Sequence, residues 1–390
     1  MDFELTEEQG LFRDSVRSFA ERHLRDGALE RAHADAYPWD VAELMAEAGL
    51  LGITSSEQDG GVGGTLMDAV IAIQEVARVC PRSADVIQAG NFGAIRVLAQ
   101  YGSEDQKRRY LAPLLAGKAL ISVAMTEPNA GSAVTELTTT ATPDGNGGYR
   151  IKGSKVFTTH GLHATVFLVY VRYGPGVGGI GSVLIERGAD GFSFGKPVRF
   201  LSGEEWNPLY FDDVHVPTEN VVLGPGGFKK QMAGFNVERI GNSSRALALG
   251  RYAFDVAREH ATTRRQFGRT LSDFQGLQWK FAEMKLQLEA AQLLLYQAAT
   301  QADRGFPSAE ATALAKLACN RAGFNAANEA MQIMGGAGFG EDSLVEYCFR
   351  RTRGWMIAGG TIEILLNRVA EGVFGTRFSQ RPATVLREAV

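Results

Sequence analysis

The chain has 390 residues, of which 45% are hydrophobic, and a formal net charge of −4. This length allows two or three domains with buried cores, and the weakly acidic balance without basic clusters argues against nucleic acid as a partner. Three widely separated cysteines indicate neither a disulfide framework nor a zinc site, and no apolar run is long enough to span a membrane. The acidic start lacks an apolar signal region, so we expect no export and a cytoplasmic location.

The first third of the chain predicts helices. Thr6 and Gln9 resemble a capping box, and apolar residues recur after them at helical spacing. Two more helical stretches, 41–50 and 67–79, flank the glycine-rich loop 59–65. We therefore assign residues 1–119 to an N-terminal helical domain.

The pattern changes at residue 120 to short β-branched or aromatic runs separated by turn residues, which predicts a small β barrel or sandwich over residues 120–227. The stretch G-V-G-G-I-G (176–181) matches a dinucleotide fingerprint, but a strand pattern follows it, so we interpret it as a hairpin tip. His160 and His163 are expected on opposite faces of a strand, and nothing completes a metal site around them. The five strand runs are 121–125, 149–153, 165–173, 181–187 and 208–217.

The rest of the chain, 228–390, is predicted to form a C-terminal four-helix bundle from three long helical segments and a closing segment. In the closing segment Thr361 is a plausible N-cap, and Gly359 and Gly360 before it allow a ligand or another chain to approach the backbone. The predicted fold class is therefore α+β, mainly α. The helical segments are 237–264, 274–299, 309–334 and 355–370.

Two turns at strand ends carry hydroxyl groups, T-E-P-N-A-G-S (126–132) and K-V-F-T-T-H-G (155–161). Together they suggest a wall that hydrogen-bonds a planar polar heterocycle, although each alone could be a plain loop. The arginine-rich turn 264–275 between two helices suits a pyrophosphate, because guanidinium groups offer a fork of donors. The glycines in M-Q-I-M-G-G-A-G-F (331–339) could be a simple helix C-cap.

Taken together, these stretches resemble the acyl-CoA dehydrogenase family, flavoproteins that remove two hydrogens from the α and β carbons of a CoA thioester. The matching motifs occur in the family's order over most of the chain. The resemblance implies an FAD cofactor, an acyl-CoA substrate, an electron-transfer flavoprotein as electron acceptor, and a homotetramer built as a dimer of dimers. The motifs are Y-G-S-E-D-Q-K-R-R-Y-L-A-P-L-L-A-G (101–117), T-E-P-N-A-G-S, F-D-D-V-H-V-P, R-R-Q-F-G, Q-I-M-G-G-A-G and A-G-G-T.

The resemblance also implies which residues contact FAD. One group lies in the two hydroxyl-bearing turns, where the family more often has tryptophan at the position of Phe157. A second group would reach the FAD of a neighbouring subunit, which is why shared cofactor pockets imply a tetramer. The first group is Thr126, Ser132, Phe157 and Thr159; the second is Arg264, Phe267, Gln275, Gln332 and Gly336; Thr361 and Glu363 also match FAD-contacting positions.

The catalytic base is displaced from its commonest position. Many family members have a glutamate where Gly359 stands, although the Gly359 N–H can still donate to the thioester carbonyl and stabilise the charge that develops there. The branch that acts on branched acyl chains has its glutamate at the start of the first bundle helix, which corresponds to Glu238. The alternative is that Glu238 is a solvated residue whose negative charge stabilises the N-terminal end of the helix through the helix dipole. Arg239 beside it is expected to contact the substrate.

Two further features bear on the acyl group. Ser202 and Glu204 depart from the family, which usually has an arginine and a serine around the intervening glycine. Arg82 stands where glutaryl-CoA dehydrogenase has an arginine that anchors the distal carboxylate of its substrate. The alternative for Arg82 is a surface arginine at a helix end. The sequence leaves the acyl group open.

The 3-sulfinopropanoyl-CoA desulfinase branch of the family is the second reading, since Y-P-W-D, F-Q-G-L-Q-W and I-A-G-G-T resemble it. That branch binds FAD without net dehydrogenation. It carries a glutamine where Glu238 stands and an arginine where Asp85 aligns, so we predict an acyl-CoA dehydrogenase acting on a CH–CH group. A non-enzymatic flavoprotein is the third reading.

Overall fold

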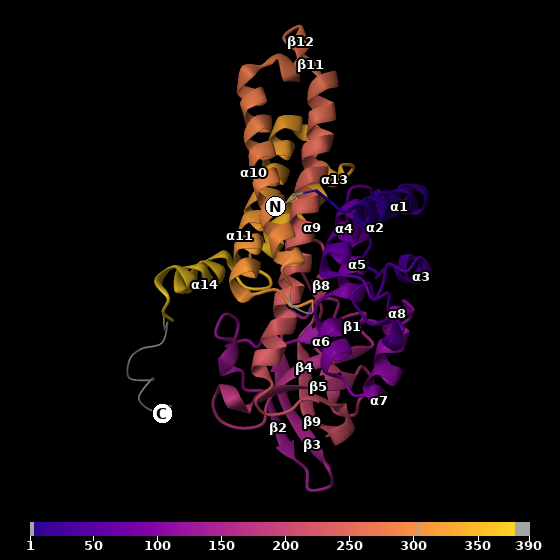
Figure 1. Cartoon of the computed structure of the whole chain (residues 1–390), viewed down its shortest axis with the longest axis vertical. Helices are drawn as coiled ribbons and strands as arrows, with labels where there is room; N and C mark the ends of the chain where they lie inside the picture. Colours follow the sequence, from indigo (N-terminus) through magenta and orange to yellow (C-terminus); the bar gives the residue numbers. More distant parts are fainter. Residues whose placement is uncertain (1–3, 303–304, 379–390) are drawn as a thin grey trace.

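The computed structural model describes residues 4–302 and 305–378. The long helices of the last third of the chain stand upright in Figure 1, the N-terminal helices lie against one side of them, and the β sheet lies below. This is the predicted order of a helical region, a β region and a helical bundle. Among the described residues, no helix is both long enough and apolar enough to cross a membrane.

The N-terminal region is built around helix α4, in which every residue except Asp68 is buried. Helices α1 and α9 both pack against it. The predicted capping box of Thr6 and Gln9 is confirmed at the start of α1, and Thr65 with Asp68 forms a second one before α4. The helices are α1 Glu7–Leu24, α2 Ala28–His33, α3 Trp39–Glu47, α4 Leu66–Ala77, α5 Ala84–Asn91, α6 Ala94–Tyr101, α7 Glu104–Gln106 and α8 Ala112–Leu115.

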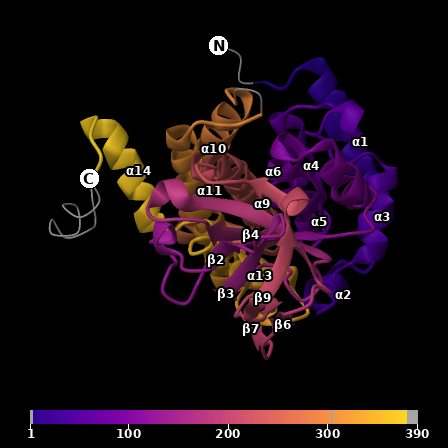
Figure 2. The same ribbon diagram turned by 90° about the horizontal axis from the view of Figure 1, so that it is seen from below.

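The predicted barrel or sandwich takes the form of one eight-stranded sheet with the order β10-β5-β4-β2-β3-β9-β6, and β1 pairs with β4. All five predicted runs are strands, and the glycine-rich stretch 176–181 runs from the turn between β4 and β5 into the start of β5, so the predicted hairpin tip is confirmed. The sheet is seen from below in Figure 2. Its strands are β1 Ile121–Ala124, β2 Thr140–Pro143, β3 Gly148–Lys155, β4 Val166–Arg172, β5 Ile180–Glu186, β6 Phe192–Phe194, β9 Leu209–Pro217 and β10 Val221–Leu223; β7 Val198–Arg199 pairs separately with β8 Glu205–Trp206.

The bundle depends on close contact between α9 and α11. A Cβ atom on Gly323 would lie 2.1 Å from the carbonyl oxygen of Ala246, and one on Gly250 would lie 2.6 Å from Cα of Gly323. Only glycine allows two helix backbones to approach this closely. The helices are α9 Phe228–Thr263, α10 Gln275–Thr300, α11 Ala309–Met334, α12 Gly336–Phe339, α13 Leu344–Trp355 and α14 Ile362–Phe374; the hairpin β11 Arg265–Gln266 and β12 Arg269–Thr270 caps the bundle.

The fourth helix of the bundle is α13, which packs against α9 and α11 and which the sequence pattern did not predict. The predicted closing helix is α14. It begins at the predicted N-cap, because the Thr361 side chain accepts a hydrogen bond from the Ile364 N–H. It packs on α11 and projects to the side of the bundle (Figure 1).

Candidate active site

The turn between α13 and α14 has both of its glycines in the left-handed region, with φ of +74° at Gly359 and +97° at Gly360. Their carbonyl groups are both engaged: Arg239 Nε donates to Gly359 at 2.8 Å, and Lys316 Nζ donates to Gly360 at 3.2 Å. Neither glycine N–H donates to another described residue. The turn therefore carries two backbone N–H groups that no described residue accepts.

Glu238 lies in the third turn of α9, too far inside the helix for the N-terminal dipole that the alternative reading requires. Burial raises the pKa of its carboxyl, and Arg245 and Gln88 oppose this shift only in part. A carboxyl with a raised pKa is suited to act as a general base near neutral pH. These features favour the catalytic reading of Glu238.

Helix α5 and the start of α6 face Glu238 with small or polar groups. A Cβ atom on Gly93 would lie 2.3 Å from Glu238 Oε2, so the carboxyl rests against that glycine. One turn along α9, a Cβ atom on Gly241 would lie 2.0 Å from Gln88 Oε1. Both polar side-chain atoms of Gln88 are buried. Its amide lies against the Glu238 carboxyl, where it opposes the rise in the pKa of that group.

A cluster of charged side chains lies next to this contact between α5 and α9. The Asp85 carboxylate accepts from three guanidiniums, at 2.7 Å from Arg82, 2.6 Å from Arg245 and 2.7 Å from Arg351. Burial opposes ionisation of Asp85, but the three arginines outweigh it and hold the pKa of this carboxyl well below its usual range. Glu204 pairs with Arg351 and lies 3.9 Å from Arg82. The cluster of Asp85, Glu204 and the three arginines therefore carries one excess positive charge.

Arg82 is thus 7% exposed and not a surface arginine. It lines a 260 Å³ cavity together with Thr159, Glu204 and Tyr347, whose buried hydroxyl has no partner among the described residues. The expectation for the two histidines was wrong: His160 and His163 lie in a turn rather than a strand, and both line this cavity. Among the described residues, no three His, Cys, Asp or Glu side chains gather to hold a metal ion.

The structure brings the two hydroxyl-bearing turns together, since the Val156 N–H donates to the Thr126 carbonyl at 2.8 Å. The ion pair of Lys155 and Glu127, at 2.8 Å, lies beneath them. Phe157 has a positive φ of 58° and is 53% exposed. Among the described residues, the buried hydroxyl of Thr158 has no partner. An exposed aromatic ring beside an unsatisfied hydroxyl fits a flavin, which is planar and rich in hydrogen-bonding atoms.

The remaining predicted FAD contacts lie apart from these turns within one chain. Phe267 is 93% exposed in the β11–β12 hairpin at the far end of the bundle (Figure 1), between Arg264 and Gln275. Gln332 and Gly336 lie at the end of α11 and the start of α12. A single chain therefore does not gather all of the predicted cofactor contacts.

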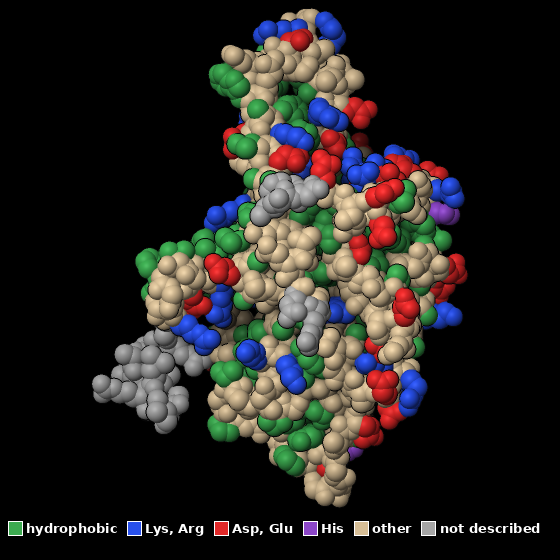
Figure 3. Space-filling view, viewed as in Figure 1, with side chains coloured by type: hydrophobic (Ala, Val, Ile, Leu, Met, Phe, Trp, Pro, Cys, Tyr) green, Lys and Arg blue, Asp and Glu red, His purple; other side chains and the backbone are tan. Residues whose placement is uncertain are grey.

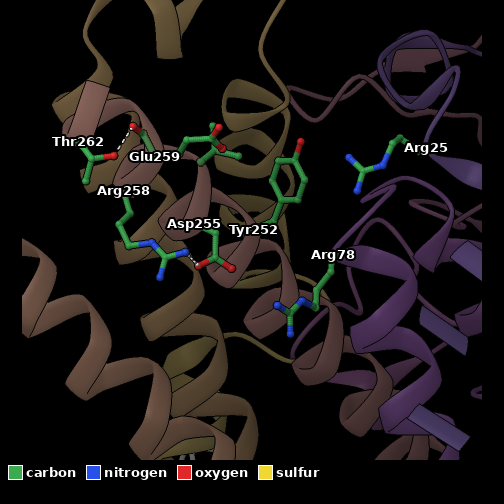
Figure 4. A pocket seen from close by; sticks show the side chains of 8 residues that line it. Arg25, Arg78, Tyr252, Asp255, Arg258, Glu259 and Thr262 are labelled. Carbon is green, nitrogen blue, oxygen red and sulfur yellow. Dashed lines mark hydrogen bonds and ion pairs between the residues drawn. The ribbon is translucent and has the colours of Figure 1, made fainter. Parts of the chain in front are cut away.

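A groove of 560 Å³ lies elsewhere, between α9 and the ends of α1 and α4 (Figure 4). Its side chains carry both signs of charge, and Arg258 pairs with Asp255 at 3.3 Å. None of the predicted site residues lines it.

Sequence reasoning missed Lys316, Arg245, Arg351 and Gln88. For Lys316 a signal existed, since it is the single charged residue in the small and apolar run A-T-A-L-A-K-L-A-C. For the arginines no local signal existed, because the pair of Arg351 and Asp85 joins residues 266 positions apart.

The chain belongs to the acyl-CoA dehydrogenase family. Models of the family's N-terminal, middle and C-terminal domains match residues 6–118, 122–214 and 225–374. FAD is the cofactor of this family, and the predicted fold and enzyme class are confirmed.

Two relatives represent the two readings of the sequence. The 3-sulfinopropanoyl-CoA desulfinase of Paraburkholderia xenovorans is 35% identical over 97% of this chain and 99% of its own. The short-chain acyl-CoA dehydrogenase of Clostridium acetobutylicum is also 35% identical, over 93% and 97%. The solved structure of butyryl-CoA dehydrogenase from Megasphaera elsdenii, 33% identical, superposes with a TM-score of 0.89 over 96% of this chain and all of that one.

Proposed function

We propose that the protein is an FAD-dependent acyl-CoA dehydrogenase of fatty acid metabolism that forms an α,β double bond in an acyl-CoA thioester. The observation that carries this proposal is a carboxyl with a raised pKa, Glu238, near a glycine turn with free N–H groups. When bound, FAD would supply the hydride acceptor for the β carbon. Thr126, Ser132, Phe157 and Thr159 would hold the flavin ring.

Glu238 would take the α proton, which passes from the substrate carbon to a carboxylate oxygen. The Gly359 N–H would donate to the thioester carbonyl and stabilise the negative charge that develops on its oxygen. Arg239, proposed from the family as a substrate contact, already donates to the Gly359 carbonyl. It would therefore also act by fixing the turn.

The test is anaerobic mixing of the purified holoprotein with straight, branched, aromatic and dicarboxylyl CoA thioesters while the visible flavin absorption is followed. Bleaching by at least one thioester is expected, and the fastest one identifies the acyl class. We propose that an electron-transfer flavoprotein, in the cytoplasm, removes the electrons in turnover. If air reoxidised the reduced flavin as fast as an added electron-transfer flavoprotein does, that result would argue against this partner.

The alternative is a non-oxidative lyase, and the desulfinase relative indicates 3-sulfinopropanoyl-CoA as the substrate to test. Incubation with 3-sulfinopropanoyl-CoA should then release sulfite without bleaching the flavin. The carboxylate of Glu238 and the ion-paired Asp85 argue for dehydrogenation, since the desulfinase branch has other residues at both positions. Sulfite release without bleaching by any thioester would establish the lyase.

We keep Arg82 as the proposed anchor of a distal acidic group. It lines the cavity beside Thr159, and its charge cluster has one excess positive charge that a substrate carboxylate would balance. Arg82→Ala should lower the preference for glutaryl-CoA over butyryl-CoA by about 10- to 100-fold, the value of a charged hydrogen bond. Arg350→Ala, which changes the same cavity at an arginine paired with Glu346, is the control. An unchanged preference in Arg82→Ala would remove Arg82 from the binding site.

We also propose a homotetramer in which Arg264, Phe267, Gln275, Gln332 and Gly336 reach the FAD of a neighbouring chain, with Thr361 and Glu363 also contacting the cofactor. An exposed apolar stripe on α10, with Trp279 65%, Leu286 64% and Leu293 46% exposed at intervals of seven residues, supports this assembly. Hydrophobic side chains are visible on the bundle surface in Figure 3.

Leu286→Glu should dissociate the tetramer, because it places a charge in the centre of the stripe. The measurement is the mass in solution by sedimentation together with FAD content per chain, and we expect both to fall. Leu11→Glu, at an equally exposed leucine of α1, should leave both unchanged. A wild-type monomer with full FAD content would contradict the proposed assembly.

A further inference from the structure

Lys316 is a fully buried lysine in the first third of α11. Its Nζ donates to the carbonyl of Trp355 at 2.9 Å and to the carbonyl of Gly360 at 3.2 Å. These two carbonyls bracket the glycine turn. One side chain of α11 therefore ties together the end of α13 and the approach to α14. Burying an ammonium group costs desolvation free energy, and hydrogen bonds to acceptors such as these two carbonyls are needed to offset that cost.

The hydrogen bonds of Lys316 belong to a larger set in which side chains of α9 and α11 donate to the carbonyl groups of the turn. Asn320, one helical turn beyond Lys316, donates to the same Trp355 carbonyl at 2.6 Å, and Arg239 donates to the Gly359 carbonyl at 2.8 Å. In a trans peptide the N–H of a residue points away from the carbonyl of the residue before it. The Gly359 carbonyl held by Arg239 therefore fixes the direction of the Gly360 N–H, and the ties of Arg239 and Lys316 together fix the backbone of the turn that carries the Gly359 N–H. A Cβ atom on Gly359 would lie 3.3 Å from Lys316 Cε, so the lysine stem also supports the turn sterically.

The charge of Lys316 acts on Glu238. Lys316 interacts with Glu238 and Arg239, both from α9. Burial and the charge of Arg239 lower the pKa of Lys316 to about 7, and Glu238 opposes that shift. Glu238 in turn interacts with Arg245 of α9, Asp85 and Gln88 of α5, and Lys316. The positive charge of Lys316 therefore favours the ionised form of Glu238.

We propose that Lys316 is a positioning residue for proton abstraction: it holds the glycine turn so that the Gly359 N–H meets the thioester carbonyl, and its charge helps to keep Glu238 ionised. This inference rests on the proposed dehydrogenase function. In that reaction the α proton passes to Glu238, and the electron pair it leaves is stabilised at the thioester oxygen. Lys316 itself neither gives nor takes a proton in this step.

Two substitutions separate the two effects. Lys316→Met removes both the donors and the charge, whereas Lys316→Gln keeps a donor and removes the charge. Cys319→Ala is the matched control, because Cys319 is buried on the same helix but its Sγ contacts the Ala291 carbonyl of α10. All four holoproteins are compared by two measurements. The first is the infrared C=O stretch of bound butyryl-CoA labelled with ¹³C at the carbonyl, and the second is the pH dependence of anaerobic flavin reduction.

In the wild type, binding should lower the C=O stretching frequency, because the carbonyl accepts a hydrogen bond. Lys316→Met should lose most of this shift, slow flavin reduction by about 10- to 100-fold, and move the acid limb of the pH profile to higher pH. Lys316→Gln should keep much of the infrared shift but show the same displacement of the pH profile. Cys319→Ala should match the wild type. If Lys316→Met does not fold, Lys316→Gln still tests the charge effect.

A wild-type infrared shift and pH profile in both lysine variants would overturn the inference, even if activity falls, because a merely structural lysine would give that result. A wild type that neither shifts the carbonyl of butyryl-CoA nor bleaches with any thioester would instead contradict the proposed function. The two failures are therefore distinguishable.

Discussion

Glu238→Gln should slow anaerobic flavin reduction by about 10²- to 10⁴-fold, the usual contribution of a positioned general base. Glutamine keeps the shape of the side chain and its fit against Gly93 but cannot accept the α proton. The measurement is the first-order rate of bleaching with the best thioester of the panel. Glu259→Gln, on the exposed surface of the same helix, is the control and should reduce its flavin at the wild-type rate.

The pH dependence of the wild type follows from the same carboxyl. Burial raises the pKa of Glu238, so its base form is lost as the pH falls through a value above that of an ordinary glutamate. The rate of flavin reduction should therefore fall on the acid side with a single ionisation. In Glu238→Gln this limb should be absent. A variant that bleaches at the wild-type rate would show that another group takes the proton.

Stability should change in the opposite direction to activity. A carboxyl whose folded-state pKa is raised destabilises the folded protein once the pH exceeds its ordinary pKa, because its charged form is better solvated in the unfolded chain. Glu238→Gln removes this penalty, so its thermal midpoint should exceed that of the wild type at pH 8. At pH 4 the difference should vanish. A gain in stability with a loss of activity is typical of a residue retained for function.

The sequence predicted features whose signals are local. Thr361 caps α14 because a threonine precedes an apolar helical pattern, and the five strand runs are visible as β-branched stretches bounded by turn residues. Glu238 was proposed as the base only through the family resemblance, since nothing around it in the sequence distinguishes a base from a solvated glutamate. Strands β2, β6 and β10 were missed because three or four residues are too few to show a period.

The charge cluster shows why the rest was beyond sequence reasoning. Helix α13 reads L-V-E-Y-C-F-R-R-T-R-G-W, where three arginines obscure an apolar face. Arg351 is 2% exposed because Asp85 and Glu204 lie opposite it. Its neighbour Arg350 instead reaches the loop carbonyl of Leu201. Which arginine turns inward depends on partners in two other domains, and no local pattern specifies those partners.

Asp85→Asn should destabilise the protein by about 3–5 kcal/mol, the cost of breaking a buried ion pair by removing one partner. The amide would leave Arg82, Arg245 and Arg351 facing each other with Glu204 as the only carboxylate of the cluster. The measurement is urea unfolding followed by tryptophan fluorescence, and Trp355 lies beneath two of these guanidiniums. Asp213→Asn, at an exposed carboxylate near Arg150 and Lys152, should cost less than about 1 kcal/mol.

The pKa of Asp85 sets the pH range of this effect. Because it is held below its usual range in the folded protein, the stabilisation is fully present above the ordinary carboxyl pKa and is lost only as the pH falls through the depressed value. The difference between Asp85→Asn and the wild type should therefore be the same at pH 6 and pH 8. A loss below about 1 kcal/mol at either pH would mean that water, not the carboxylate, compensates the three arginines.

The same cluster explains why Asp85 matters for the choice between the two proposed activities. An arginine at position 85, which the resemblance to the desulfinase branch implies for that activity, would add a fourth guanidinium where three already converge. Such a chain would have to turn Arg82, Arg245 or Arg351 elsewhere, or bind an anionic substrate group among them. Asp85 instead occupies that place with a carboxylate of the protein itself. Asp85→Arg should consequently fail to gain sulfite release from 3-sulfinopropanoyl-CoA unless Arg245 is also replaced, and the double variant with Arg245→Gln tests that coupling directly.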